Sequence, residues 1–342
     1  MEKIALVTGG NGFIGSHLCC KLVEQGIKVY SLQRRPSSHN EEFEKLRNEG
    51  KIECVIGDVK DFNYDSLPQK PNYIYHVAGK VSVWGKINEF MEINYNGTKR
   101  LLEYAKTIDL DCFTYFSSTA VYGYNGYVNL TEDGAKTPFK NPYSISKLET
   151  ENLVKDFCKE NEMKFLIVRP GNVYGEYDYT SSHEIYTRVK HGKMMMCAKG
   201  KYKSCFVYVK NLVDAVVHLS KNEDFRNTDY NLTDGNNETL FEMLNLIAKT
   251  FGVKSKFKNV PAWLSKVVAC VVEGIYKLFH IKKAPLITKF SVWQNCADYS
   301  FSIEKLLSTG FKPQYSMKQG VENTVNWINS LEEKENEIRS KK

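Results

Sequence analysis

The chain has 342 residues, of which 42% are hydrophobic and 25% charged, as is ordinary for a soluble globular protein of one large or two modest domains. Its net charge of +7 would suit a phosphate-rich cofactor or a membrane surface, but no run of lysine or arginine is long enough to predict nucleic-acid binding. Nine scattered cysteines without a C-x-x-C pair predict reduced thiols, no metal site and a cytoplasmic location. Because a strand is predicted at the N-terminus, we expect no signal peptide.

The first predicted element is a strand at residues 4–8, which runs directly into the glycine-rich turn Thr8-Gly9-Gly10-Asn11-Gly12-Phe13-Ile14-Gly15. A strand, such a turn and then a helix form the phosphate-binding start of a dinucleotide-binding unit. Gly9 and Gly12 would let the backbone turn sharply and approach a pyrophosphate, and Gly15 would let the helix pack closely on the strand. An ordinary glycine-rich turn is the alternative interpretation of this motif taken alone.

The second predicted strand, residues 28–32, is followed by Gln33-Arg34-Arg35, where a dinucleotide fold usually places a carboxylate that binds the adenosine ribose. A carboxylate there would repel a 2′-phosphate, whereas two adjacent arginines attract one. The sequence therefore favours NADP(H) over NAD(H). In the alternative interpretation Arg34 and Arg35 belong to a solvated loop, and Gln33 tolerates NAD.

Four more predicted strands follow, at 52–56, 73–77, 112–117 and 164–169, and helical stretches separate them. Strands that alternate with helices predict a parallel, doubly wound α/β sheet. After residue 175 the pattern is less regular. Residues 206–209 and 229–232 are strand-like, and we expect the second segment to return to the sheet.

Candidate catalytic residues follow the strand at 112–117, because ligands of open α/β sheets bind at the carboxyl ends of strands and Ser118 comes at that end. Downstream, Asn141-Pro142 predicts a helix start, which places Tyr143 and Lys147 on one helix face. A lysine ammonium beside a tyrosine favours the phenolate and lowers the pKa of the phenol, as proton transfer to or from an alcohol oxygen requires. Each motif alone is common, since strand-end hydroxyls often cap turns.

Taken together, these segments resemble the extended short-chain dehydrogenase/reductase family, in the family's order and through the first half of the chain. The matching motifs are the glycine-rich turn, Gly57-Asp58, His76-Val77-Ala78-Gly79, Asn94 with Gly97-Thr98, Ser118, Tyr143 with Lys147, and Arg169-Pro170-Gly171-Asn172-Val173-Tyr174-Gly175. The resemblance implies a Rossmann fold, with a dinucleotide-binding domain at 1–175 and a returning segment near 206–232. It also implies a smaller, discontinuous α/β substrate domain mainly at 176–331, and a homodimer formed through helices near Lys99 and Leu148. The charged tail at 332–342 is expected to be frayed.

The resemblance further implies roles for single residues. Tyr143 would act as general acid or base, Lys147 would lower its pKa and hold the nicotinamide ribose, and Ser118, with Thr119 as a substitute, would polarise the carbonyl. Asp58 would lie near the adenine ring. The residues expected to bind the cofactor are Gly9, Gly12, Phe13, Ile14, Gly15, Arg34, Arg35, Asp58, Val59, Ala78, Lys80, Asn94, Tyr143, Lys147, Pro170 and Val173.

The family contains epimerases, dehydratases and reductases, so the fold does not select the reaction. Dehydratases carry Asp-Glu where this chain has Thr119-Ala120, and nucleotide-sugar enzymes commonly carry an arginine near 201–205, where this chain has lysines.

Residues 78–85 and 260–264 resemble the 3β-hydroxysteroid dehydrogenase and 2-alkyl-3-oxoalkanoate reductase branch. The sequence therefore predicts an NAD(P)-dependent oxidoreductase that interconverts a ketone and a secondary alcohol on a hydrophobic small molecule. The alternatives are a nucleotide-sugar 4-epimerase with tightly bound NAD and a dinucleotide-sensing protein without catalysis.

The most apolar helical stretch, 264–281, has its aliphatic residues on one face, but Lys266, Glu273 and Lys277 interrupt it, so we expect no membrane span. Three interpretations stay open. The helix is a lid or packing helix beside the substrate, a contact between subunits, or a peripheral helix on a membrane surface, which the flanking Trp263 and Lys282-Lys283 favour.

Overall fold

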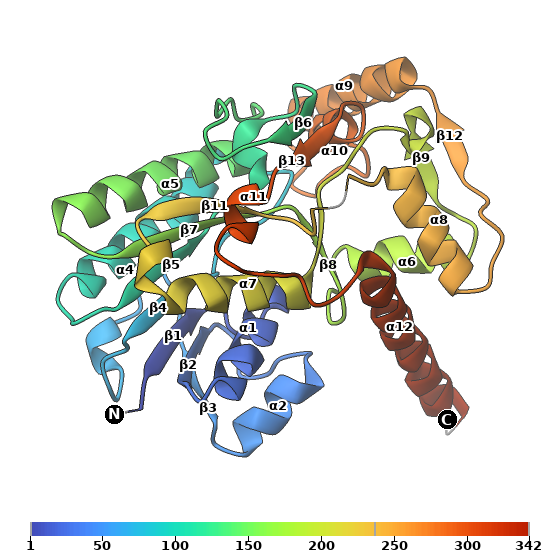
Figure 1. The fold of residues 1–342 in the computed structure, drawn as a ribbon. Coiled ribbons are helices and arrows are strands. Elements are labelled where there is room, and N and C mark those ends of the chain that lie inside the picture. The colour runs from blue at the N-terminus through green and yellow to red at the C-terminus, as the bar shows by residue number, and fades with distance from the viewer. Residues whose placement is uncertain (1, 236, 341–342) are drawn as a thin grey trace.

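The structure, a computed structural model, describes residues 2–235 and 237–340. Its centre is a seven-stranded sheet in the order β11-β7-β5-β4-β1-β2-β3, in which every neighbouring pair is parallel (Figure 1). The strands are β1 (Ile4–Thr8), β2 (Lys28–Gln33), β3 (Ile52–Ile56), β4 (Tyr73–His76), β5 (Cys112–Phe116), β7 (Phe165–Pro170) and β11 (Thr228–Leu232). The predicted parallel, doubly wound α/β sheet is confirmed, with strand ends within two residues of their predicted places.

Helices cover both faces of this sheet, since its strands are apolar on both sides. One core lies beneath α1 (Phe13–Glu24), α2 (Glu41–Asn48) and α7 (Val209–Lys221). The other lies beneath α4 (Gly97–Ala105) and α5 (Pro142–Glu160). β1 pairs with β2 on one side and β4 on the other, so the chain order reverses there. The carboxyl ends of strands at such a switch point border the crevice where ligands of this architecture bind.

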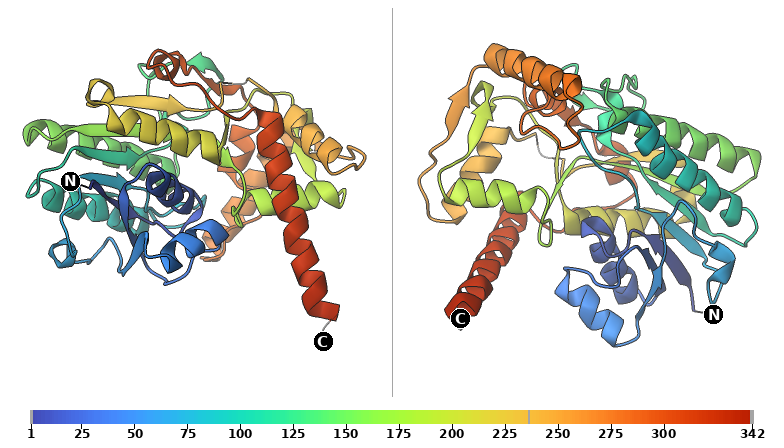
Figure 2. Two further views of the ribbon diagram at one scale, coloured as in Figure 1. Left: turned by 60° about the horizontal axis from the view of Figure 1, so that its bottom comes forward. Right: turned by 180° about the vertical axis from the view of Figure 1, so that it is seen from behind.

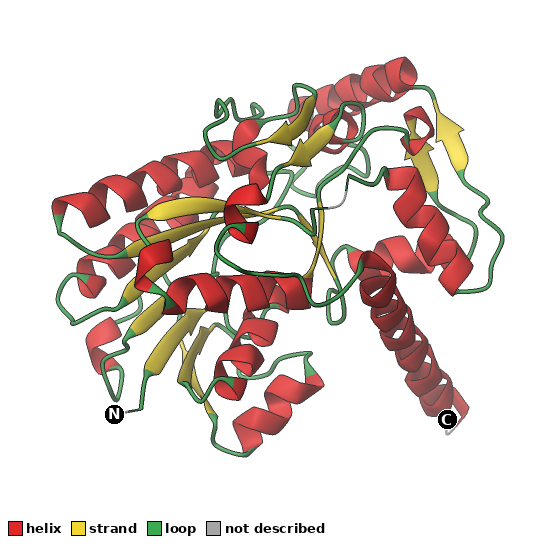
Figure 3. Cartoon of the chain, viewed as in Figure 1, coloured by secondary structure: helices red, strands yellow, loops and turns green. Residues whose placement is uncertain are grey.

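The remaining elements form a smaller region at one end of the sheet (Figure 3). Its strands pair as β8 (Asn172–Tyr174) with β10 (Phe206–Tyr208), β9 (Met195–Cys197) with β12 (Lys258–Val260), and β6 (Tyr127–Leu130) with β13 (Tyr299–Phe301). Its helices are α6 (Ser182–Lys190), α8 (Leu240–Thr250), α9 (Ala262–Leu278), α10 (Lys289–Gln294) and α12 (Met317–Ser340). Two short helices belong to the main sheet: α3 (Ile87–Phe90) precedes α4, and α11 (Glu304–Leu307) packs beside β11. A third core joins α6, α8 and the first half of α12.

The C-terminal tail differs from its prediction. We expected 332–342 to be frayed, but α12 continues to Ser340 and projects away from the body of the molecule (Figure 2). Side chains of this half of the helix find partners: Lys190 pairs with Glu332 at 2.5 Å, and Lys334 pairs with Glu41. Residues 341–342 lie outside the described residues.

Candidate active site

The glycine-rich turn between β1 and α1 is packed so closely that side chains are excluded. Gly9 has φ +70°, and a Cβ there would lie 3.1 Å from the backbone of Ala78. A Cβ on Gly15 would lie 2.2 Å from the carbonyl oxygen of Gly9, so α1 rests directly on the turn. Gly12 has an ordinary φ of −76°, and a Cβ there would lie 3.2 Å from the Gly9 oxygen. Its role is therefore to save space rather than to permit an unusual backbone angle.

The first turn of α1 is open to an anion. Gly12 is the residue that caps the helix, and no side chain accepts a hydrogen bond from the first backbone N–H groups. Phe13 and Ile14, two predicted cofactor residues, are the first two residues of this helix. Free N–H groups and the positive end of the helix dipole favour a phosphate at this position. This arrangement fits the pyrophosphate of a dinucleotide.

The loop after β2 lies beside the turn, because Asn11 donates from Nδ2 to the carbonyl oxygens of Arg35 (3.1 Å) and Ser37 (2.9 Å). The Gln33 side chain is buried. It accepts from the Ser31 hydroxyl at 2.6 Å and donates to the Arg35 carbonyl at 2.8 Å, so it holds the loop rather than facing outward. Arg34 and Arg35 are both exposed.

Two further predicted cofactor residues follow β3. The Asp58 carboxylate accepts from the backbone N–H of Lys60 at 3.1 Å, and its carbonyl accepts from Phe62 at 2.9 Å. Val59 is buried against the start of α4, where a Cβ on Gly97 would lie 3.0 Å from it. The two residues close this edge of the crevice.

Asn94 connects the loop after β4 to the helix that carries Tyr143. Its Oδ1 accepts from the backbone N–H of Lys80 at 2.6 Å, and its Nδ2 donates to the Ser146 hydroxyl on α5 at 2.9 Å. The same loop includes Ala78, whose N–H donates to the Thr8 hydroxyl at 3.2 Å. The loops after β1 and β4 and the start of α5, all of which carry predicted cofactor residues, therefore lie in one place.

Helix α5 begins as predicted. Asn141 accepts from the backbone N–H of Ser144 at 2.9 Å, and Pro142 occupies the first helical position. Tyr143 and Lys147 follow one turn apart. Lys147 is 4% exposed, and its Nζ donates to the carbonyl oxygen of Phe116, at the carboxyl end of β5, at 2.6 Å.

Burial shifts the pKa values of both groups. Burial raises the pKa of Tyr143, and a hydrogen bond with Ser118 acts in the opposite direction. The ammonium of Lys147 is directed at the Phe116 carbonyl, and the proposed effect of Lys147 on the Tyr143 pKa stays a prediction. Burial lowers the pKa of Lys147 itself to about 8. In the free chain the phenol is therefore protonated at neutral pH.

A buried ion network, which sequence reasoning missed, lies behind Ser118. Arg169 and Glu151 are fully buried, and two nitrogens of the guanidinium donate to the two oxygens of the carboxylate, at 2.5 and 3.0 Å. Ser117 donates to the same carboxylate at 2.9 Å, and Arg169 also pairs with Asp229. The network fixes the carboxyl ends of β5 and β7 relative to the middle of α5. Nothing in the spacing of Glu151 indicated this role.

The last predicted cofactor residues are Pro170, at the end of β7, and Val173, in β8. The Thr119 hydroxyl donates to the carbonyl oxygen of Pro170 at 3.2 Å, so it is already engaged. Val173 is in β8 and pairs with Val207 of β10. These residues lie at the boundary between the main sheet and the smaller region.

A cavity of about 1290 Å³ adjoins the Tyr143 side of this crevice. It reaches Pro142, and its wall residue Phe290 places its ring 6.4 Å from the ring of Tyr143. Its aromatic wall consists of Trp84, Tyr124, Phe139, Tyr276, Phe290 and Trp293, and its charged residues are Lys80, Lys86, Lys140, Lys277, Lys282, Lys289, Glu89 and Glu273. Sequence reasoning missed Phe290 and Trp293, because the short helix α10 has no recognisable pattern.

Metal-binding clusters and membrane-spanning helices are both absent from the described residues, 2–235 and 237–340. No group of three or more His, Cys, Asp or Glu side chains in them is arranged to hold a metal ion. Within the same ranges, no helix combines the length and apolar character needed to cross a bilayer.

The chain is similar to known proteins in sequence and in fold. The pattern of the NAD dependent epimerase/dehydratase family matches residues 5–233. A Methanocaldococcus jannaschii protein provisionally named UDP-glucose 4-epimerase is 25% identical over 340 residues, covering 94% of this chain and 97% of its own. A 2-alkyl-3-oxoalkanoate reductase of Shewanella oneidensis is 24% identical over 336 residues, covering 93% and 84%. The solved structure of Bacillus cereus UDP-glucuronic acid 4-epimerase in complex with NAD superposes with a TM-score of 0.77 at 21% identity, covering 96% of this chain and 99% of that one.

Proposed function

The chain belongs to the NAD dependent epimerase/dehydratase family, and we propose that it is an epimerase that inverts a hydroxyl-bearing carbon of a nucleotide sugar by oxidising and then re-reducing it. The observation that carries the substrate class is the charge of the cavity. Six lysines line it against two carboxylates, and one of these, Glu89, already pairs with Lys80 at 2.5 Å. An excess of cations beside aromatic walls suits a diphosphate that carries a planar base. The relatives named as epimerases point the same way.

The proposed chemistry uses three side chains at the carboxyl ends of the strands. Ser118 would hold the substrate oxygen, Tyr143 would take its proton and later return it, and Lys147 would bind the nicotinamide ribose and support the phenolate. When bound, a nicotinamide dinucleotide accepts the hydride and gives it back. The protonated phenol of the free chain is the form that reduction of a carbonyl needs, since it can donate its proton to the oxygen. The oxidising half requires the phenolate.

A specific observation favours a second candidate, reduction of a hydrophobic ketone with NADPH. The loop after β2 holds no carboxylate from Gln33 to Asn40, and Arg34 and Arg35 are exposed, which suits a 2′-phosphate. The aromatic side of the cavity would bury an apolar substrate equally well. A relative named as a 2-alkyl-3-oxoalkanoate reductase agrees with this candidate.

One experiment separates the two. Freshly purified protein is denatured and the released dinucleotide is identified, and then conversion of UDP-sugars is followed by NMR without added cofactor. An epimerase retains NAD and converts the sugar with no net change in the cofactor. Release of NADP, or an empty protein that oxidises NADPH with a hydrophobic ketone, would contradict the epimerase and support the reductase.

A variant controls for the chemistry. Tyr143→Phe should lower turnover by about 10²- to 10⁴-fold, because the acid–base group is lost while the ring still fills its place. Its dinucleotide content should equal that of the wild type. Tyr104→Phe, which removes the hydroxyl of a buried tyrosine in the core under α4, is the matched control and should keep full turnover.

A further inference from the structure

Helix α9 presents an apolar face that no part of the described chain covers. Its members recur every three or four residues and are each between 37% and 72% exposed: Leu264, Val267, Val271, Ile275 and Leu278. The opposite side of the helix carries Ser265, Ala269 and Glu273, which are buried. Trp263 and Phe279 extend the exposed surface at the two ends, at 68% and 70%. These seven exposed residues are called the α9 face.

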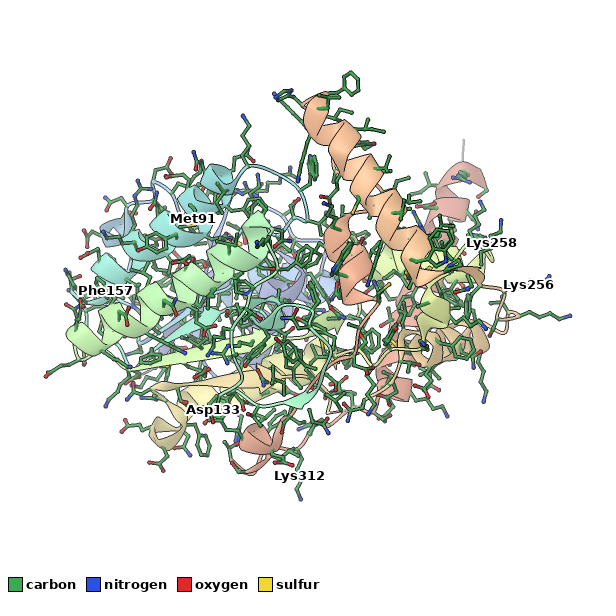
Figure 4. All side chains as sticks on the ribbon, turned by 90° about the horizontal axis from the view of Figure 1, so that it is seen from above. Met91, Asp133, Phe157, Lys256, Lys258 and Lys312 are labelled. Carbon is green, nitrogen blue, oxygen red and sulfur yellow. The ribbon has the colours of Figure 1, made fainter. Side chains whose placement is uncertain are left out.

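The stretch of chain that contains the α9 face is strongly positive. The stretch from 243 to 297 contains nine lysines and a single carboxylate, Glu273, for a net charge of +8. Because the whole chain carries +7, the rest of it is net −1. Glu273 points inward and accepts from the backbone N–H of Lys289 at 2.6 Å. Figure 4 shows Lys256 and Lys258 at the side of the molecule where α9 begins, with Lys256 projecting outward.

We propose that the α9 face docks on a lipid bilayer that carries anionic headgroups. An amphipathic helix lies in the plane of such an interface with its apolar side among the acyl chains, and lysines at its borders meet the phosphates. An aromatic residue such as Trp263 suits the boundary between chains and headgroups. A second copy of the chain fits less well, since a two-fold contact through this face would bring two lysine-rich stretches together.

The docked orientation has a consequence for the cavity. Tyr276, Lys277 and His280, at the carboxyl end of α9, form part of its wall. A bilayer in contact with the α9 face would therefore lie next to that wall. Docking on such a surface does not depend on which reaction the site performs.

Flotation of the full chain with vesicles tests the proposal. The protein should float with vesicles of phosphatidylcholine mixed with phosphatidylglycerol, remain unbound with phosphatidylcholine alone, and dissociate as salt is raised. Val271→Asp combined with Leu278→Asp should weaken binding by about tenfold or more, because charges replace buried apolar contacts. Ile338→Asp is the matched control, since Ile338 is an apolar side chain on α12 that is 58% exposed.

A charge-reversal pair tests the electrostatic part. Lys256→Glu with Lys283→Glu should weaken binding to anionic vesicles by about tenfold or more. Lys312→Glu with Lys318→Glu changes the net charge equally at exposed positions away from α9 and should leave binding unchanged. Equal loss in both variants would mean that only net charge matters and would overturn the assignment to α9.

The wild-type chain supplies a readout without mutation. Cys270 is exposed on α9, whereas the other eight cysteines are buried or half-buried. Its alkylation should slow when anionic vesicles are added. Absence of vesicle binding would overturn the proposal. In that case, a dimer in size-exclusion chromatography that Val271→Asp with Leu278→Asp converts to a monomer would assign the face to a contact between copies of the chain.

Discussion

His76, which the sequence motif contained without a role, joins three elements by its ring nitrogens. Its Nδ1 bonds with the Thr8 hydroxyl of β1 at 2.7 Å, and its Nε2 bonds with the Thr98 hydroxyl of α4 at 2.8 Å. Burial lowers the pKa of His76 to about 3, and the charge of Lys147 acts in the same direction. The imidazole is therefore neutral in the folded chain at all physiological pH values.

We predict that this residue makes the fold sensitive to acid. Between pH 6.5, the ordinary value for histidine, and about 3, the unfolded chain binds a proton that the folded chain does not, so stability falls as the pH falls through this range. Between pH 7 and pH 5, this group lowers the free energy of unfolding by about 2 kcal/mol. Urea unfolding at the two pH values measures it. His76→Gln should reduce the difference by about this amount, whereas His191→Gln, at an exposed position, should preserve it; equal pH dependence in the two variants would contradict this role of His76.

The active-site residues show how far sequence reasoning reaches at this scale. Spacing placed Tyr143 and Lys147 on one face of a helix with the correct cap, since capping and helical periodicity are local properties. The direction in which the pKa of Tyr143 shifts could not be predicted from spacing. It depends on burial and on the hydrogen bond with Ser118, which tertiary packing brings to the phenol.

At the scale of elements, the contact between α1 and its preceding turn should be intolerant of even one methyl group. Gly15→Ala places a Cβ 2.2 Å from the Gly9 carbonyl oxygen, so the helix must shift away from the turn that would hold the phosphates. We expect a loss of about 1–3 kcal/mol in the free energy of unfolding and at least about tenfold weaker dinucleotide binding. Denaturant unfolding and a cofactor titration measure the two effects.

The matched control is Gly274→Ala, in the middle of α9. A Cβ there meets nothing within 4 Å, so only helix propensity changes, and stability should rise by up to about 1 kcal/mol with cofactor binding unaffected. If Gly15→Ala behaved like this control, the turn would be looser than its contacts indicate.

Element prediction succeeded where the pattern is local and failed where it is not. The strands of the parallel sheet are short apolar runs between helices, and their order in the sheet follows from doubly wound topology. The pairing of β6 with β13 joins residues about 170 positions apart and leaves no local signal. For the same reason, the contribution of α10 to the cavity could not be predicted.

At the scale of the whole molecule, α12 has two halves with different surroundings. Its first half contributes Val321, Val325 and Ile328 to the core that also contains α6 and α8. Its second half, from Glu332, is mainly exposed and touches the rest of the chain through ion pairs with Lys190 and Glu41. Charged composition led us to expect a frayed end, because composition does not reveal that a helix begun in the core can extend beyond it.

Two truncations should therefore have unequal effects. Removal of 332–342 deletes solvent-accessible ion pairs, which contribute little to stability, so the midpoint of urea unfolding should stay near that of the full chain. Removal of 325–342 also deletes Val325, Trp327 and Ile328, and should cost about 3 kcal/mol or more, since it opens the third core. If both truncated chains kept the midpoint of the full chain, the first half of α12 would not complete this core. If removal of 332–342 alone lowered the midpoint as much as the longer truncation, the projecting half would have a stabilising partner, such as a second copy of the chain.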